Sequence, residues 1–573
     1  MRKLWTTAGW MLLALVVLRV LTMPLWPLVD PTEARYAELG RQMAITGDWV
    51  TPRVWVSGYL IPFLGKPPLY FWTEALSIKF LGANEFAARL PSLLAAAVAV
   101  AATGLVLARF YGRAVAGLAM MVLASCGMFF VLAGTVGVDM VLTAMVALAQ
   151  VAYFAWLREE KPWPRRGWSL LVFLALGLGF LTKGPVAVIT FGMPVFLWHC
   201  LFGEWKRLVH HAWITGLLLA LAIVVPWFWE AQKLNPDFIR HFFVEENFRR
   251  FTTHDYYDPY GSGHVVPHGG AILFMLVAAL PWSVLAFWLL KGNGQKATRE
   301  ANRLWSDRWQ AFFFLGFAVN VLFWCAGRQF LITYMLPLLP VFAIWFALRW
   351  QERMPGREAL VAKSAGAVAV LISLIYVIFP ILTQDQFIKS MKPVIAKLKD
   401  LDRVQPPPVG GCWHLEPPVR GPHSLYFYGT QDPDSDQWPI HIDGKPGMLT
   451  LAKDKQTRQY PYLKRLDAGN DKPVTSEPLQ TIIDRSLAQR NSLILFAKRD
   501  LREHPALATG TGKRQKLLPP ESLQRLSCYG SPGKSVKLRS AGPGDYPRLE
   551  RVFETAQWSA YLPVAAPLPV SNP

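Results

Sequence analysis

Long apolar runs alternate with short polar connections over the first two thirds of the chain, up to about residue 383. A run of about 20 apolar residues is long enough to cross a bilayer as a helix. We count eleven such runs and therefore expect eleven transmembrane helices. Their approximate ranges are 8–29, 86–108, 114–132, 140–157, 168–182, 185–201, 212–229, 269–290, 309–325, 330–350 and 363–383.

The pattern changes after residue 383, where polar residues and prolines replace the apolar runs. A helical pattern near 384–400 is followed by strand-like runs such as 424–429 and 491–499. The sequence thus predicts an α-helical transmembrane domain at 1–383 and a soluble α/β domain at 384–573.

The charges indicate how the chain crosses the membrane. A net charge of +20 suits nucleic-acid binding, but Lys and Arg gather in alternate short connections, which is typical of the positive-inside pattern. With Arg2 and Lys3 in the cytoplasm, all these basic connections lie there, and an odd number of spans places loop 30–85 and the tail outside. In a bacterium this means the inner membrane and a periplasmic tail. The first run lacks a small-x-small cleavage site and predicts an uncleaved signal anchor.

Cysteine and histidine spacing does not indicate a metal site. Of the five cysteines, three lie in apolar runs, while Cys412 and Cys528 lie in the tail and can pair if it faces an oxidising compartment. The histidines of 254–268 are irregularly spaced. We expect no cofactor and no divalent metal.

The first polar segment, 29–52, supports two interpretations. Asp30 and Glu33 fit the start of a helix, as cap and capping-box partner, with Tyr36, Leu39 and Met43 on one face against the membrane surface. Alternatively, carboxylates at the end of a span face a cavity at the bilayer boundary. Partial desolvation there raises a carboxyl pKa and makes the group a usable base.

Three further charged positions are candidates: Lys66 in the first long loop, and Asp139 and Lys183 at the ends of apolar runs. Lys66 precedes two prolines, which hold its backbone extended, so it is either a phosphate ligand or a lysine that reaches the membrane interface. Asp139 opens an apolar run and either caps that helix or serves a functional site. Lys183 lies in a tight turn between two spans and is interpreted as a structural anchor.

A later loop carries two adjacent arginines, Arg249 and Arg250. Their planar donors suit a phosphate or pyrophosphate, yet each can also pair with Glu245 or Glu246 on a solvated helix. Arg328, at the mouth of a span, is either an interface anchor or another anion contact.

Taken in order, five motifs resemble those of the bacterial membrane glycosyltransferases of the GT-C superfamily: DPTEARYAELGRQMAITGDWVTP, GKPPLYFW, NEFAARLPS, LTKGPV and YMLPLLP. The nearest branch is the 4-amino-4-deoxy-L-arabinose lipid A transferases, akin to protein mannosyltransferases. The resemblance covers about residues 1–350. It implies a polyprenyl-phosphate sugar donor, a periplasmic active-site cavity and inversion at the sugar carbon.

The resemblance also implies roles for individual residues. It assigns Lys66 to the donor phosphate and Asp139 to a second acidic position. Glu33, Arg35 and Tyr36 match the motif of the first periplasmic loop, and Tyr334 matches the tyrosine before the later Leu-Pro.

The chain departs from the family at three positions. Thr32 stands where the family commonly has Asp before Glu33, so either Asp30 or Glu33 can be the base. Gly65 and Asn247 stand where the aminoarabinose branch has Glu and His, which predicts a metal-independent relative.

The expected function is transfer of a sugar from undecaprenyl phosphate to lipid A, another glycan or protein. Asp30 or Glu33 would orient or deprotonate the acceptor with support from Asp139. The lipid phosphate would be bound by Lys66, Arg35, Arg249 and Arg250, and Tyr36, Tyr334 and Arg328 would line the substrate site. We expect membrane lipids among the partners. We expect no nucleic-acid partner. The alternative is a lipid or glycolipid flippase, which favours charged residues in mid-span and an internal repeat.

Overall fold

The computed structural model describes residues 2–56, 59–253, 265–290 and 307–383, residues 390, 392–394 and 396–397, and seven strands beyond them. The chain forms two compact units. The first comprises Met1–Trp26, Gln42–Pro52 and Phe63–Phe379, and the second comprises Pro27–Arg41, Arg53–Pro62 and Pro380–Pro573. The division predicted from the sequence, at residue 383, stays a prediction.

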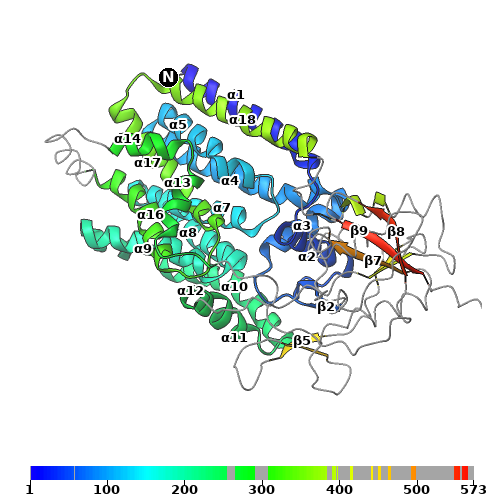
Figure 1. The fold of residues 1–573 in the computed structure, drawn as a ribbon. Helices are drawn as coiled ribbons and strands as arrows, with labels where there is room; N and C mark the ends of the chain where they lie inside the picture. The colour runs from blue at the N-terminus through cyan, green and yellow to red at the C-terminus, as the bar shows by residue number, and fades with distance from the viewer. Residues whose placement is uncertain are drawn as a thin grey trace, which may run out of the picture. The chain divides into compact units, whose positions relative to one another are not determined.

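The first unit is helical (Figure 1). Its helices are α1 (Arg2–Thr22), η1 (Met23–Leu25), α3 (Leu69–Leu81), α4 (Glu85–Tyr111), α5 (Arg113–Ser125), α6 (Gly127–Leu132), α7 (Val138–Arg158), α8 (Pro162–Lys183), α9 (Pro185–Phe202), η2 (Glu204–His210), α10 (Trp213–Leu234), α11 (Phe238–Arg240), η3 (His241–Arg249), α12 (Arg250–Thr252), α13 (Gly270–Ala278), α14 (Trp282–Leu290), α16 (Arg308–Ala326), η4 (Ile332–Leu338), α17 (Leu339–Arg353) and α18 (Glu358–Thr383).

Nine helices in the described ranges are long and apolar enough to cross a membrane, which confirms a multi-pass helical membrane protein. The other two of the eleven predicted runs are broken helices. Run 114–132 forms α5 and α6, which are separated at Cys126, and run 269–290 forms α13 and α14, which are separated near Pro281. Apolarity alone does not reveal such breaks, although Pro281 is a helix breaker.

The two breaks lie against each other and complete each other's polar contacts. The Gly127 N–H donates to the Leu280 carbonyl at 2.8 Å. The Trp282 indole N–H donates to the Ser125 hydroxyl at 3.1 Å. Backbone groups at membrane depth must find partners within the protein, because lipid tails offer none. The paired breaks meet this requirement.

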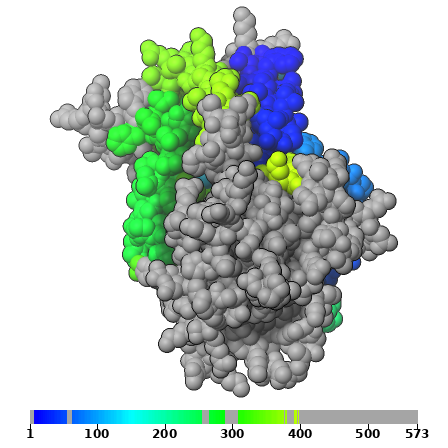
Figure 2. All heavy atoms as spheres, turned by 45° about the vertical axis from the view of Figure 1, so that its right-hand side comes forward, coloured from blue at the N-terminus to red at the C-terminus, as the bar shows by residue number. Residues whose placement is uncertain are grey.

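The core of the first unit surrounds α7, of whose span 89% is buried. A helix that is apolar on all sides is expected to be enclosed by others. At the periphery, α1 and α18 lie side by side (Figure 1), where Leu15 and Ala369 share a cluster with Ala124 and Phe130. Figure 2 shows α1 in blue and α18 in yellow-green on one face. Both carry exposed apolar side chains, such as Trp10 of α1, which suits contact with lipid.

The second unit contains strands and the first part of a helix. A five-stranded mixed sheet has the order β4-β3-β7-β9-β8, and β1 pairs with β2 and β5 with β6 as antiparallel hairpins. The predicted strand at 491–499 appears as β7, whereas run 424–429 lies outside the described residues. The strands are β1 (Arg53–Val56), β2 (Tyr59–Pro62), β3 (Trp413–Glu416), β4 (Ile440–Ile442), β5 (Leu449–Ala452), β6 (Tyr462–Arg465), β7 (Ser492–Ala497), β8 (Arg548–Glu554) and β9 (Trp558–Val564).

Helix α2 (Thr32–Thr46) begins in the second unit, close to where the capping pattern predicted a helix start. Its apolar residues Tyr36 and Leu39 are buried, but so are the charged Glu38 and Arg41. Those two form a bidentate ion pair with distances of 2.7 and 2.8 Å. The helix is therefore buried on its charged side as well as on its apolar side. Its interpretation as a helix on the membrane surface stays a prediction.

Candidate functional site

One carboxylate holds two cations from distant parts of the chain. Oε2 of Glu246 accepts from Lys66 Nζ at 3.1 Å and from Arg250 Nη1 at 3.0 Å. Lys66 also donates to the Gly65 carbonyl at 2.6 Å. The Glu246 side chain is 2% exposed and those of Lys66 and Arg250 are 11% and 12% exposed. The three groups thus form a compact, largely dehydrated ionic cluster.

Helix η3, which carries Glu246, is a π-helix. Its wider turn leaves carbonyl groups that α-helical geometry would satisfy differently, and the Asn247 side chain donates to one of them, the Phe242 carbonyl, at 2.7 Å. Such π segments are rare and occur frequently at functional sites. The Asn247 side chain is therefore bound to its own helix.

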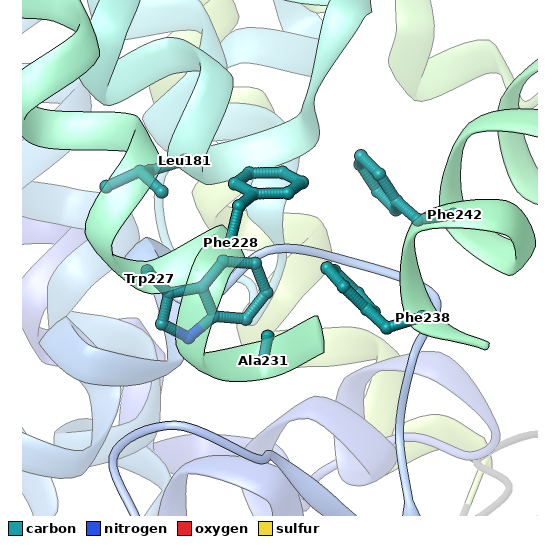
Figure 3. Packing of buried hydrophobic residues seen from close by; sticks show 6 residues of the cluster. All are labelled: Leu181, Trp227, Phe228, Ala231, Phe238 and Phe242. Carbon is teal, nitrogen blue, oxygen red and sulfur yellow. The ribbon is translucent and has the colours of Figure 1, made fainter. Parts of the chain in front are cut away.

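An aromatic cluster fixes this π-helix against the spans. Figure 3 shows Phe238 and Phe242 facing Trp227 and Phe228 of α10, with Leu181 of α8 beside them. The Trp227 indole N–H donates to the Val50 carbonyl at 3.0 Å. Fully burying an aromatic or aliphatic side chain of this size contributes about 1.5–3 kcal/mol. The cluster therefore holds η3 close to the end of α8.

Gly184 is where this packing depends on a glycine. Its φ is +76°, and a Cβ added there would lie 2.4 Å from Cζ of Phe242. Only glycine adopts this backbone and leaves room for the ring. The constraint stands next to Lys183, the last residue of α8.

Lys183 joins Asp139 and Tyr334 in a second group. It forms a short ion pair with Asp139, and its Nζ lies 3.5 Å from the ring centroid of Tyr334. This arrangement combines an ion pair with a cation–π contact. The turn before Asp139 is held in place by α3, because the Tyr70 hydroxyl accepts from the Gly137 N–H at 3.0 Å.

The two groups converge on Tyr334. Lys183, Arg250, Lys66 and Asp139 all interact electrostatically with its hydroxyl. The residues that meet at this end of the helical unit come from the loop before α3 and from α7, α8, η3, α12 and η4. Three cations face two carboxylates, so these ion pairs carry a net charge of +1.

Electrostatics fix the charge of Glu246. Burial acts to raise the pKa of its carboxyl, but the charges of Lys66 and Arg250 outweigh it. His241 and the hydrogen bond from Lys66 also lower the pKa of this carboxyl, which falls to about 2 from an ordinary 4.5. Glu246 is therefore an anion at neutral pH.

The two arginines predicted to bind phosphate have different surroundings. Arg249 pairs with Glu245 at 2.9 Å and is 29% exposed, whereas Arg250 joins the cluster with Lys66. Both therefore make the i,i+4 pairs that the sequence left open. The Arg328 backbone N–H donates to the Phe251 carbonyl at 3.0 Å, which puts this residue beside α12.

The remaining predicted site residues belong to the second unit. Oε2 of Glu33 accepts from the Val29 N–H at 3.0 Å, so this carboxylate stabilises the start of α2 by a contact other than the predicted bond to Asp30. The Arg35 guanidinium lies 5.4 Å from the centroid of the Tyr36 ring. Glu33, Arg35 and Tyr36 are buried.

Within the described ranges, no three His, Cys, Asp or Glu residues gather as potential metal ligands. The predictions of no metal and no cofactor stay predictions, since His254 and His264 lie outside those ranges. Cys412 and Cys528 lie outside them as well, so their pairing also remains a prediction.

Comparison with known proteins shows which membrane transferases the chain resembles. Residues 65–229 match the family model of dolichyl-phosphate-mannose-protein mannosyltransferases. An undecaprenyl phosphate-alpha-4-amino-4-deoxy-L-arabinose arabinosyl transferase of Pseudomonas paraeruginosa is 30% identical over 60% of this chain and 60% of that protein. The undecaprenyl phosphate-alpha-4-amino-4-deoxy-L-arabinose arabinosyl transferase 1 of Pseudomonas fluorescens is 28% identical over 62% of this chain and 59% of that protein. The match spans about 60% of the length of these relatives.

The fold has solved counterparts. The crystal structure of ArnT from Cupriavidus metallidurans bound to undecaprenyl phosphate has a TM-score of 0.64 at 17% identity, covering 98% of this chain and 99% of that one. The same protein in the apo state also has a TM-score of 0.64. The resemblance predicted from the motifs is therefore confirmed: this membrane protein has the fold of ArnT and is similar in sequence to the aminoarabinose transferases.

Proposed function

We propose that this chain is an integral membrane glycosyltransferase that moves a sugar from a polyprenyl phosphate to an acceptor. The observation that carries the proposal is the convergence of Lys66, Arg250 and Lys183 with two carboxylates next to the ends of α7 and α8. Three cations at a membrane boundary suit a lipid phosphate. The names of the relatives, which specify undecaprenyl phosphate and an arabinose derivative, support this donor class.

The cations act on the leaving group. When the bond between the anomeric carbon and the phosphate oxygen breaks, its electron pair stays on the phosphate. Lys66 and Arg250 are oriented before the reaction by Glu246, so they stabilise this new charge without rearranging. Donors fixed in a dry site contribute several kcal/mol to such a transition state, about 3–4 in measured oxyanion sites.

The carboxylates act on the acceptor and on the site's shape. Asp139 is paired with Lys183 and thereby orients it, which makes Asp139 a supporting residue rather than a proton acceptor. Asp30 or Glu33 remains our candidate for the base that receives the proton of a hydroxyl acceptor. Attack from the face opposite the phosphate inverts the sugar carbon. Arg35, Arg249, Tyr36 and Arg328 remain candidate substrate contacts.

We further propose that the reaction occurs on the periplasmic side of the bacterial inner membrane. The support is the charge of the connections, since Lys and Arg gather in those opposite the predicted active site. The acceptor class includes lipid A, other glycans and protein. Protease added to intact spheroplasts tests this orientation, because it reaches the tail only if the tail lies on the periplasmic face of the inner membrane. Cleavage only after membrane disruption contradicts it.

Transfer from a lipid-linked donor is the direct test. Purified protein in liposomes is supplied with undecaprenyl-phosphate aminoarabinose and lipid A, and product is followed by mass spectrometry. We expect strong losses for Lys66→Ala and for at least one of Asp30→Asn and Glu33→Gln. Lys233→Ala removes a surface lysine that is 55% exposed and serves as the control. If all three site variants transfer sugar like the control, the proposal is wrong.

A further inference from the structure

Glu246 carries a charge of the same sign as the phosphate that the site would bind, and it contacts both Lys66 and Arg250 directly. One of its oxygens accepts from both Lys66 and Arg250, at 3.1 and 3.0 Å. A neutral acceptor would have sufficed to orient the two cations. The buried carboxylate instead reduces the charge of this trio from two to one.

Gly65 leaves room beside this carboxylate. A Cβ at residue 65 would lie 3.3 Å from Oε1 of Glu246, closer than most such contacts. The glycine before Lys66 therefore leaves space for the carboxylate. The neighbouring pair differs, since Glu245 holds only Arg249 among the described ion pairs, in a more exposed position.

The proposed reaction changes the charge of the bound lipid. The donor is a phosphodiester with one negative charge. Breaking the anomeric C–O bond leaves its electron pair on the phosphate, the acceptor oxygen bonds to the sugar, and the acceptor's proton leaves to a base. The lipid product is then a phosphomonoester with a charge near −2 at neutral pH. A site with two uncompensated cations would hold this product more tightly than the donor.

We propose that Glu246 is a positioning residue that limits the affinity for the lipid phosphate product and so permits its release. This inference rests on the proposed function. Glu246 orients Lys66 and Arg250 towards one point, and its charge matches the trio to the monoanionic donor. The Asp139–Lys183 pair is internally neutral and leaves this balance unchanged.

The first experiment compares Glu246→Gln with the wild type and with Glu245→Gln. A unit charge about 6 Å from the phosphate, at an effective dielectric constant near 20, changes affinity on the order of 10- to 100-fold. We expect Glu246→Gln to bind a short polyprenyl phosphate more tightly by roughly that factor. Its KM and kcat should both fall, while the single-turnover rate stays within about threefold of the wild type. Glu245→Gln should leave the affinity unchanged.

These readouts separate charge balance from a structural role. A residue that only holds the fold would weaken lipid phosphate binding when replaced. Unchanged or weaker binding by a folded Glu246→Gln protein therefore overturns the inference, as does an equal gain in Glu245→Gln. Wild-type protein that does not prefer polyprenyl phosphate to neutral polyprenol overturns the donor-phosphate proposal itself, and this inference with it.

A second measurement needs no variant and holds even if Glu246→Gln does not fold. The wild type is titrated with polyprenyl phosphate and with its methyl ester, which carry charges near −2 and −1 at pH 8. With the trio at a net charge of +1, the one additional negative charge of the monoester should strengthen binding by roughly 10- to 100-fold. A preference for the monoester on the order of 1,000-fold or more overturns the inference, because the site would then behave as an uncompensated dication.

Discussion

Gly184→Ala tests whether the packing of η3 against α8 builds the site. The substitution adds one methyl group at a backbone φ of +76°, and this methyl group would lie 2.4 Å from Cζ and 2.8 Å from Cε1 of Phe242. Both the backbone and the ring oppose it. The ring is fully buried and packs against Phe228 and Phe238, so it has little space into which to move.

The magnitude follows from these two terms. A non-glycine residue in such a backbone conformation costs about 1–3 kcal/mol. Overpacking in a filled core costs a further 1–3 kcal/mol or so. We therefore expect Gly184→Ala to lower the free energy of unfolding by about 4 kcal/mol. Gly203 is the control for a glycine of positive φ without packed neighbours: its φ is +67° and no atom lies within 4 Å of an added Cβ, so its alanine variant should lose only about 1 kcal/mol.

Denaturant titration of the purified protein in mixed micelles measures these differences. Phe242→Ala alone should cost about 3–5 kcal/mol through the lost ring. In the double variant the clash disappears, so the combined loss should be smaller than the sum by about 1–3 kcal/mol. If Gly184→Ala is as stable as Gly203→Ala, or if the two changes add without coupling, Gly184 and Phe242 are not packed as described.

Three further results are expected. Lys66→Met should reduce sugar transfer and weaken polyprenyl phosphate binding at least about tenfold, measured by initial rates and titration; equal affinity in both proteins would contradict a phosphate role. Asp139→Asn leaves Lys183 without its carboxylate and should lower the free energy of unfolding by about 3 kcal/mol, and Lys183→Met added to it should recover part of that loss. The pKa of Glu246 is about 2, below its ordinary 4.5, so its contribution to stability is complete above about pH 4.5 and is lost as the pH falls towards 2. The unfolding temperature of the wild type should fall over that window and that of Glu246→Gln should fall less; parallel curves would show that this carboxylate is not stabilised by folding.

The membrane helices were predictable because their signal is local. A run of apolar residues must cross the bilayer as a helix, whatever it packs against. The two broken helices show the limit of that signal. Runs 114–132 and 269–290 are as apolar as the others, and their breaks are stabilised by a bond from Gly127 to Leu280, far along the chain.

In the site, too, local contacts were predictable from the sequence and contacts between distant parts of the chain were not. The sequence offered two partners for Arg250, and the pair with Glu246 four residues earlier is present. The third member, Lys66, lies 180 residues from Glu246 in the chain, and no local pattern encodes that separation. Lys183 was interpreted as an anchor in a turn, yet it pairs with Asp139 across two helices. Such contacts depend on how the spans pack.

The adjacency of α1 and α18 constrains how the protein can be made. Roughly 335 residues separate the end of α1 from the start of α18. A ribosome that adds about 5–20 residues per second needs roughly 15–70 s to synthesise them. During that time Leu15 and its neighbours lack the Ala369 side of their cluster. Helix α1 must therefore stay in the bilayer without α18, stabilised by α5 or by the insertion machinery, until α18 has been synthesised and inserted.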